Sequence, residues 1–407
     1  MDETVLSSGE RNKTGQIDGQ PTMGELMAAA RDMLPTLRER ARQCEELRRV
    51  PEETIQEFQD AGFFKILQPA EFGGYELWPQ ALYRVCSIVA QACPSSAWVL
   101  SVIVIHNWEM GVLPREASVD VWAEDEHVRI SSSYAPFGEA VPVEGGYKVS
   151  GRWHYSSGCD HCDWAFLGSL LKEEGKPPRL IASLVPRKDY VIDDTWHVSG
   201  LAGTGSKDIV VEEAFVPDHC VHVLSDEHAK GLRDRPYFDG PAYQVPFYAA
   251  FGYCLTSIPL GIARGAYEYY VEMNQSRRNA FDGSSYKKDP LNQQRLAEAW
   301  AILDGCELKF ERDMADMQSY VEKGEEIPLE KRAMYRWNQA YIAKACTEAV
   351  TILFKAAGAR ATYLDNPMQR FFRDINSASN HYLINADAGA TSFGEFQLTG
   401  AYPNGAV

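Results

Sequence analysis

The sequence predicts an α+β protein in which a small β-domain lies between two helical regions. Apolar residues recur every three or four positions, as in residues 26–37, and the same spacing returns after residue 246. Between the helical regions the apolar positions alternate in short runs separated by Gly, Pro and Asp. We therefore expect four parts along the 407 residues: a disordered leader at 1–22, an N-terminal helical domain at 23–127, a central β-domain at 128–235 and a C-terminal helical bundle at 236–407.

The first helical region contains one segment that we expect to be buried on every side. A helix begins at Pro51 and Glu52 and reaches Gly62, a typical C-cap, and Pro and paired Gly then exclude further helix at 68–74. Residues 97–105 are apolar almost without interruption, a pattern typical of a helix in the core. His106, Asn107 and Trp108 stand at the end of this run.

The central region predicts an antiparallel barrel or sandwich of short strands. A Gly145-Gly146 turn joins two alternating segments and predicts a hairpin. The expected strands are 128–134, 140–143, 147–155, 164–171, 180–186, 190–196, 209–215 and 220–223. The C-terminal region then predicts an antiparallel four-helix bundle, because four long amphipathic segments are joined by short polar links. These segments are 248–273, 291–321, 329–357 and 368–388.

Composition excludes several classes of protein. A net charge of -17, from 57 acidic and 40 basic residues, disfavours nucleic acid and anionic membranes as partners. The sequence contains no run of about 18 apolar residues, the length that predicts a membrane-spanning helix. The polar N-terminus lacks the apolar centre of a signal peptide. Nine scattered cysteines are typical of reduced thiols. We expect a cytoplasmic protein.

The end of the predicted hairpin is unusually rich in polar side chains. Between Ser156 and Asp163 the sequence places hydroxyls, thiols and a histidine within a few residues, more than a strand end needs for its hydrogen bonds. Cys159 and Cys162 have redox or zinc spacing, but no second ligand pair completes a metal set, so packing thiols are favoured. Residues 200–207 are glycine-rich like a phosphate loop, but Ser206 precedes Lys207 instead of following it. We therefore predict a binding site at the hairpin end, without a metal.

Several motifs resemble a known superfamily in order along nearly the whole chain. Gln68-Pro-Ala-Glu-Phe-Gly-Gly, Gly200-Leu-Ala-Gly-Thr-Gly-Ser, Arg278-Asn-Ala-Phe and Met368-Gln-Arg-Phe-Phe-Arg-Asp are similar to landmarks of the acyl-CoA dehydrogenase superfamily. The segments at 104–108, 130–134 and 153–161, with His381, resemble the oxygenase components of two-component flavin-dependent aromatic monooxygenases. The p-hydroxyphenylacetate and secosteroid-phenol hydroxylase types are the most similar.

The resemblance implies a fold, a cofactor and a partner. The fold would be acyl-CoA dehydrogenase-like, with the bundle assembling a homotetramer. The cofactor would be reduced FMN, with FAD as the other option, which reacts with O2 to give a C4a-hydroperoxide that hydroxylates an aromatic, phenolic substrate. A separate NAD(P)H-dependent flavin reductase would supply the reduced flavin, since the chain has no strand-Gly-x-Gly-x-x-Gly-helix element of its own.

The resemblance also implies residue roles, each with a plainer structural alternative. Ser157 would lie at flavin N5, with Ser156 as its alternate, unless both only cap the strand end. His106 and Ser132 would contact the phenol hydroxyl, with Trp108 beside the substrate, unless His106 only satisfies a helix end. The remaining expected residues are His381 on the last long helix facing the flavin, Thr204 and Ser206 by the flavin ring edge, Arg278 on a flavin phosphate of a neighbouring subunit, and His161 ordering the turn.

The rival function is that of an acyl-CoA dehydrogenase, which needs a carboxylate base. The region after Asp374 lacks the expected glutamate motif, and the only later glutamate is Glu395. The monooxygenase interpretation is therefore preferred.

Overall fold

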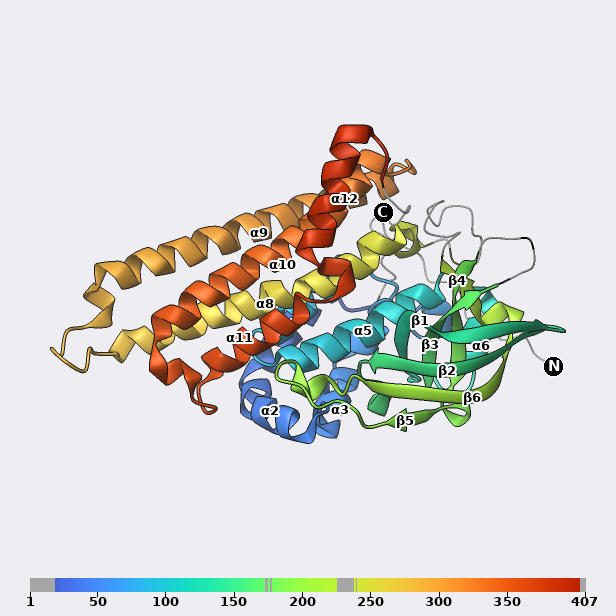
Figure 1. The fold of residues 1–407 in the computed structure, drawn as a ribbon, viewed down its shortest axis with the longest axis horizontal. Coiled ribbons are helices and arrows are strands. Elements are labelled where there is room, and N and C mark those ends of the chain that lie inside the picture. The colour runs from blue at the N-terminus through green and yellow to red at the C-terminus, as the bar shows by residue number, and fades with distance from the viewer. Residues whose placement is uncertain (1–18, 173–174, 176–177, 225–237, 239, 403–407) are drawn as a thin grey trace.

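The computed structural model describes residues 19–172, 175, 178–224, 238 and 240–402. Helices, then strands, then helices follow one another along the chain, which confirms the α+β fold (Figure 1). Most of the expected leader and the expected boundary between residues 235 and 236 lie outside the described residues. No helix in the described part of the chain has both the length and the apolar character needed to cross a membrane.

The N-terminal helices surround one central helix, α5. The six helices of this region are α1 (Met23–Asp32), α2 (Leu34–Leu47), α3 (Glu52–Asp60), α4 (Gln80–Ala90), α5 (Pro94–Met110) and α6 (Arg115–Trp122). Thr22 and Glu25 form a capping box that starts α1. Every residue of α5 except Val102 is buried, as the apolar run predicts. This helix therefore lies in the core between the β-domain and the bundle.

The β-domain is one seven-stranded sheet in the order β5-β6-β2-β1-β3-β4-β7. Its strands are β1 (Ile130–Val143), β2 (Gly146–Ser156), β3 (Trp164–Leu171), β4 (Arg179–Pro186), β5 (Val191–Asp193), β6 (Lys207–Pro217) and β7 (Val221–Val223). The expected strands 128–134 and 140–143 are one strand, β1, with a register shift between Ser133 and Gly138. Among the described strands every pairing is antiparallel except β1 with β3, which is parallel. The sheet is therefore mixed, because the chain crosses over after the β1–β2 hairpin and returns on the far side of β1.

The bundle extends away from the sheet and differs from the prediction at one point. Its long helices are α8 (Phe247–Ser276), α9 (Pro290–Glu322) and α10 (Leu329–Ala357), followed by the shorter α11 (Pro367–Ala378) and α12 (Ala386–Thr399) (Figure 1). The expected helix 368–388 was wrong in its second half, since α11 ends at Ala378 and a short 3-10 turn, Tyr382–Ile384, precedes α12. His381 therefore lies between two helices, not on a long one. Its ring accepts a hydrogen bond from the backbone N–H of Leu383, an alternative to helix that polar side chains favour.

Candidate functional site

The end of β2 directs two neighbouring serines to opposite sides. Tyr155 has a left-handed backbone (φ 67°), and the β2–β6 register shifts between Trp153 and Ser156. A bulge of this kind changes which face each following side chain meets. Ser156 is fully buried and donates to the Ser131 hydroxyl at 3.1 Å, whereas Ser157 faces α5.

Ser157 belongs to a row of hydroxyl groups. Its Oγ accepts from the Trp98 indole N–H at 3.1 Å and lies 2.7 Å from the Ser206 hydroxyl. Ser206 in turn lies 2.7 Å from the Thr204 hydroxyl, which donates to the Leu201 carbonyl at 2.9 Å. The structure thus brings together three of the expected cofactor residues, Ser157, Thr204 and Ser206.

A glycine lets this turn approach α5. Gly158 has a φ of 71°, and a Cβ at this position would lie 2.8 Å from a methyl group of Val99. Its N–H also donates to the Thr204 carbonyl at 2.9 Å. Any side chain at residue 158 would push the Ser157 hydroxyl away from Trp98.

His381 completes this part of the site from the other side of Trp98. The two ring centroids lie 5.7 Å apart. Desolvation by the surrounding chain and the charge of Arg336 lower the pKa of His381 to about 4, although the residue is exposed in the single chain. Because Nδ1 accepts from Leu383 at 3.2 Å, the neutral ring carries its proton on Nε2. His381 therefore offers a hydrogen-bond donor at neutral pH.

Helix α11 anchors the loop that carries Thr204 and Ser206. The Leu201 N–H donates to Asp374 at 2.6 Å, and Arg373 binds both the Ser199 carbonyl and Glu45 of α2. Burial raises the pKa of Asp374 to about 7, with the Leu201 hydrogen bond acting against it. The loop is thus attached to both helical regions.

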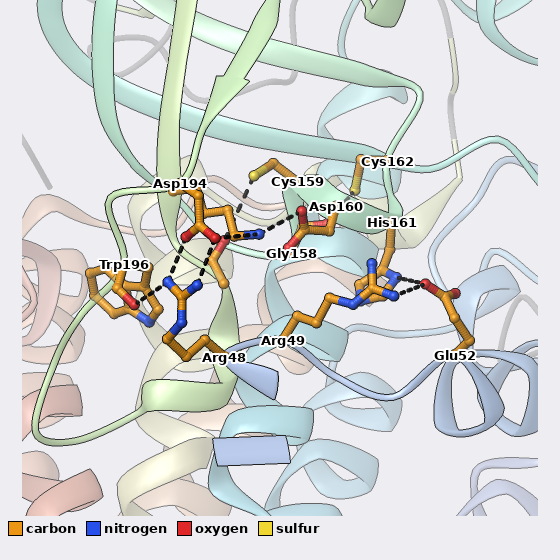
Figure 2. Close-up of polar contacts among 12 residues, drawn as sticks. Arg48, Arg49, Glu52, Gly158, Cys159, Asp160, His161, Cys162, Asp194 and Trp196 are labelled. Carbon is orange, nitrogen blue, oxygen red and sulfur yellow. Dashed lines mark hydrogen bonds and ion pairs between the residues drawn. The ribbon is translucent and has the colours of Figure 1, made fainter. Parts of the chain in front are cut away.

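Ion pairs tie the hairpin end to the N-terminal helices (Figure 2). Arg48 makes two hydrogen bonds to Asp194, at 2.6 and 2.7 Å, and Lys207 donates to Asp160 at 2.9 Å. His161 is 5 % exposed, and its Nδ1 lies 3.5 Å from a Glu52 oxygen. Burial lowers the pKa of His161. The position of His161 suits the expected structural role beneath the turn.

The two cysteines of this turn are buried and bonded to backbone. Cys159 donates to the Gly205 carbonyl and Cys162 to the Gly158 carbonyl, at 3.6 and 3.3 Å. Burial raises the pKa of the Cys159 thiol to about 12 and raises that of Cys162 as well. Neither thiol is therefore a ready nucleophile.

The opposite end of α5 holds a buried polar cluster, of which the sequence predicted only His106 as a site residue. We name Glu109, His106, His222 and Tyr134 the Glu109 cluster. Both residues of the pair Glu109 and His222 are fully buried, and their Oε1 and Nδ1 atoms lie 2.9 Å apart. Nδ1 of His106 lies 3.3 Å from Oε2 of Glu109 and 3.0 Å from the Tyr134 hydroxyl, which donates to the same Oε2.

The cluster keeps Glu109 ionised in the core. Burial acts to raise the pKa of Glu109, but hydrogen bonds from His106 and His222 outweigh it and bring the pKa to about 2. Burial and the charge of Glu109 raise the pKa of Tyr134. Ser132 stands two residues before Tyr134 on β1, so the two side chains project from the same face of the strand. The one signal in the sequence was a glutamate three residues after His106, a spacing that faces one side of a helix.

Two other expected residues lie apart from both groups. Trp108 is fully buried, and its indole N–H donates to the Ala242 carbonyl at 2.8 Å, so it can contact a substrate only through its ring. Arg278 is exposed in the connection between α8 and α9 and donates to the Gly283 carbonyl at 3.1 Å. Figure 1 shows this connection at the end of the bundle farthest from the sheet. Within one chain Arg278 does not join the site.

One group among the described residues has ligand atoms near enough to share a metal ion, namely Asp120, His219 and Cys220. Asp120 and His219 already form an ion pair at 2.7 Å, and Asp120 is exposed. We assign no metal site there.

The hydroxyl row fits a reduced flavin. A hydroxyl group has one donor and two acceptor positions, and Trp98 and Ser206 occupy two of those on Ser157. Because Thr204 donates to Leu201, Ser206 donates to Thr204 and Ser157 donates to Ser206. One acceptor position therefore remains on Ser157, and it suits a ring N–H. The Nε2–H of His381 adds a donor on the far side of Trp98. Neutral polar groups of this kind suit the edge of an isoalloxazine ring.

Comparison with known proteins defines the class first. The acyl-CoA dehydrogenase N-terminal domain family matches residues 23–110, and the acyl-CoA dehydrogenase C-terminal domain family matches residues 253–386. A crystal structure of 3-HSA hydroxylase from Rhodococcus sp. RHA1 superposes with a TM-score of 0.89 at 36 % identity, covering 94 % of this chain and 99 % of that one. The acyl-CoA dehydrogenase-like fold is thereby confirmed.

Two relatives narrow the class. The chain is 40 % identical over 353 residues to the flavin-dependent monooxygenase oxygenase subunit HsaA of Rhodococcus jostii, covering 86 % of this chain and 92 % of that protein. It is 35 % identical over 381 residues to the FADH2-dependent resorcinol hydroxylase oxygenase component of a Rhizobium species, covering 90 % of this chain and 92 % of that protein. The chain belongs to the family of flavin-dependent monooxygenase oxygenase subunits, and it is an enzyme of the two-component kind.

Proposed function

We propose that the protein hydroxylates a small phenolic aromatic compound with reduced flavin and O2. The reduced flavin comes from a separate NAD(P)H-dependent reductase, in keeping with the word component in the name of the Rhizobium relative. FMN was expected from the sequence, while that relative is named for FADH2. Both flavins therefore belong in the test.

One observation carries this proposal: helix α5 contacts the hydroxyl row, which suits a flavin edge, at one end, and at the other end it carries the His106 imidazole, whose Nε2 has no hydrogen-bond partner among the described residues. Trp98 contacts Ser157, and His106 follows eight residues later on the same helix. At about 1.5 Å per residue, the two lie about 12 Å apart along the axis, so a flavin edge held at Ser157 and a phenol held at His106 would be close neighbours. A phenol hydroxyl would satisfy the buried Nε2 of His106.

The chain's own residues would divide the work as follows. Bound reduced flavin would activate O2 for transfer to the aromatic ring. Ser157 would hold the flavin edge near N5, with Thr204 and Ser206 behind it, and the Nε2–H of His381 would donate a hydrogen bond to the oxygen being transferred. His106 and Ser132 would bind the phenol, and the burial of Ser157 and His106 keeps water from these two groups. Arg278 would reach a flavin phosphate only in a neighbouring subunit.

The dehydrogenase alternative finds no support in the position of its candidate base. Glu395 lies exposed on α12, whereas a base that removes a proton beside a flavin must be held within reach of a shielded substrate. No second function is proposed.

Assembly and location extend the proposal. Large apolar side chains are exposed on the bundle, including Trp300 and Leu308 on α9 and Tyr341 on α10. Such residues favour association through the bundle, and we propose a homotetramer, to be measured by light scattering. All nine cysteines are free, which suits the cytoplasm, where NAD(P)H is available to the reductase.

The test supplies reduced FMN or FAD from a generic flavin reductase with NADH, together with ¹⁸O2 and a panel of phenols, indole and an acyl-CoA. We expect one ¹⁸O atom in at least one phenol, detected by mass spectrometry. Oxygen insertion only into indole would contradict the phenolic assignment. Anaerobic oxidation of the acyl-CoA by bound flavin would establish the dehydrogenase instead.

A further inference from the structure

The Glu109 cluster contains a buried carboxylate for which the proposed chemistry gives no reason. An ionised carboxylate in the core is costly unless it is fully hydrogen-bonded. Glu109 is 0 % exposed and receives three donors, one each from α5, β1 and β7. A packing role would be served at lower cost by an apolar side chain of similar size. The cluster therefore indicates a specific electrostatic task.

The hydrogen-bond pattern fixes which nitrogen of His106 carries the proton. Nδ1 lies within reach of two oxygens, the Glu109 carboxylate and the Tyr134 hydroxyl. The carboxylate only accepts, and the Tyr134 proton is directed to that same carboxylate. Nδ1 must therefore be the donor. In the neutral ring Nε2 is then left as a bare acceptor, and it is this buried atom that lacks a partner among the residues described.

His222 holds the carboxylate from the other side. Its Nδ1 lies 2.9 Å from Oε1 of Glu109, so the same reasoning makes Nδ1 its donor. The rings of Phe166 and Phe251 also pack against His106, and neither carries a charge. Glu109 and Tyr134 are the titratable groups bonded to His106 in the described structure, and His222 acts on it through Glu109.

We propose that Glu109 is a positioning residue that makes His106 a proton acceptor for the substrate hydroxyl. The inference rests on the proposed phenol hydroxylation, in which His106 is the base, and it identifies Glu109 as the residue that supports this base. In the step, the phenol O–H bond breaks and an N–H bond forms at Nε2 of His106. The products are a phenolate and an imidazolium, and the Glu109 carboxylate stabilises the positive ring, as a carboxylate behind a catalytic histidine does. The phenolate is the more electron-rich ring for oxygen transfer.

The proposal is tested with Glu109→Gln, which keeps the size of the side chain and removes its charge. The probe is 4-nitrophenol, whose anion is yellow, bound anaerobically in the presence of reduced flavin. In the wild type we expect the bound probe to ionise at lower pH than in water. In Glu109→Gln its ionisation should move upward by about one pH unit, and turnover of an ordinary phenol should fall about 10- to 100-fold. Turnover of phenols that are already ionised at the assay pH should fall far less in Glu109→Gln.

Asp313→Asn is the matched control, because Asp313 is also a fully buried carboxylate, bonded to Tyr253 and Asn338 in the bundle. It should leave the probe's ionisation unchanged. An identical probe spectrum in folded Glu109→Gln and wild type would overturn the positioning role. A wild type that binds no phenol and oxygenates none would instead overturn the proposed function, and the two failures are thus distinct.

His222→Phe provides a second test if Glu109→Gln does not fold. This change removes one donor from the carboxylate, so more of its negative charge acts on the His106 ring. We expect bound 4-nitrophenol to ionise at a lower pH than it does in the wild type, by about half a unit to one unit. An unchanged ionisation of the bound probe in the folded variant would also count against the proposal.

Discussion

The two ends of helix α5 differ in charge: neutral hydrogen-bonding groups surround one end, and a buried ionised carboxylate lies at the other. At the Trp98 end the contacts are made by an indole N–H and hydroxyl groups, and His381 nearby has a pKa lowered to about 4. At the His106 end a fully buried carboxylate is held ionised, with its pKa lowered to about 2. One rigid helix thus joins a neutral end and an ionic end.

The difference follows from what each end would bind. Hydroxyl groups donate and accept without adding charge, which suits the edge of a reduced ring that must not be protonated or displaced by a charged neighbour. A phenol has a pKa of about 10, so drawing off its proton near neutral pH needs a base supported by negative charge. Variants at the two ends should therefore fail in different ways.

The largest effect is expected for His106→Asn. The asparagine amide can replace Nδ1–H as a donor to Glu109, but it has no basic nitrogen for the phenol. We expect oxygen transfer to a phenol to fall about 100-fold or more, within the usual range for a lost general base, while the affinity for reduced flavin stays unchanged. Single-turnover product analysis and anaerobic flavin titration measure the two quantities. Weakened flavin binding would show that the two ends are not separate.

Ser157→Ala should be the strongest variant at the neutral end. Loss of the hydroxyl leaves the Trp98 N–H and the flavin edge without a partner, so more oxygen should leave as hydrogen peroxide. A lost hydrogen bond of about 1.4 kcal/mol corresponds to a tenfold change in the ratio of product to peroxide. Peroxide and product are measured together at the end of the reaction.

Ser156→Ala is the control for this variant, because Ser156 donates to Ser131 on the other side of the strand. The ratio of hydroxylated product to hydrogen peroxide in this variant should match that of the wild type. Equal leakage from both serine variants would mean that the end of β2 acts through its backbone and not through the Ser157 hydroxyl.

The sequence was informative about the neutral end's parts but not about their orientation. The apolar run predicted α5 correctly, and the turn residues predicted the hairpin. Ser156 and Ser157 were indistinguishable, because the bulge at Tyr155 depends on pairing with β6, a strand about fifty residues later in the chain. His381 was predicted on a helix because its neighbours continue the helical pattern, whereas α11 ends at Ala378 and the His381 ring caps the following turn by accepting from Leu383.

The ionic end was harder to foresee. Glu109 stands next to an apolar run, where a glutamate is ordinarily read as the first exposed residue after a buried helix. Its partners His222 and Tyr134 come from β7 and β1, and no local pattern joins them. Clusters of this type depend on which strands the fold places side by side. They become visible only in three dimensions.

Asp374→Asn tests whether the anchor of the Thr204 and Ser206 loop makes the free energy of unfolding depend on pH. The folded-state pKa of Asp374 is about 7, above the value near 3.9 of an unfolded chain. The ionised form is therefore disfavoured by folding, and wild-type stability falls as pH rises from about 4 to 7. Asparagine removes this cost and can still accept from Leu201. We expect the variant to gain about 2–3 kcal/mol relative to wild type between pH 5 and pH 8, measured by urea unfolding. If the difference in the free energy of unfolding between the variant and the wild type did not change with pH, Asp374 would not be the group that titrates in this range.

The smallest effect is expected for Trp98→Phe, which tests how much of the comparison depends on α5 itself. Phenylalanine keeps an aromatic ring beside His381 but removes the N–H that donates to Ser157 at 3.1 Å. Ser157 retains its contact with Ser206, so its hydroxyl should stay near its place with more freedom. We expect about a threefold rise in peroxide leakage, since a neutral hydrogen bond contributes about 0.5–1.5 kcal/mol, and no change in the pH profile of phenol hydroxylation. A shifted pH profile would mean that the ends of α5 are coupled through the helix, because Trp98 touches no group of the Glu109 cluster that the structure describes.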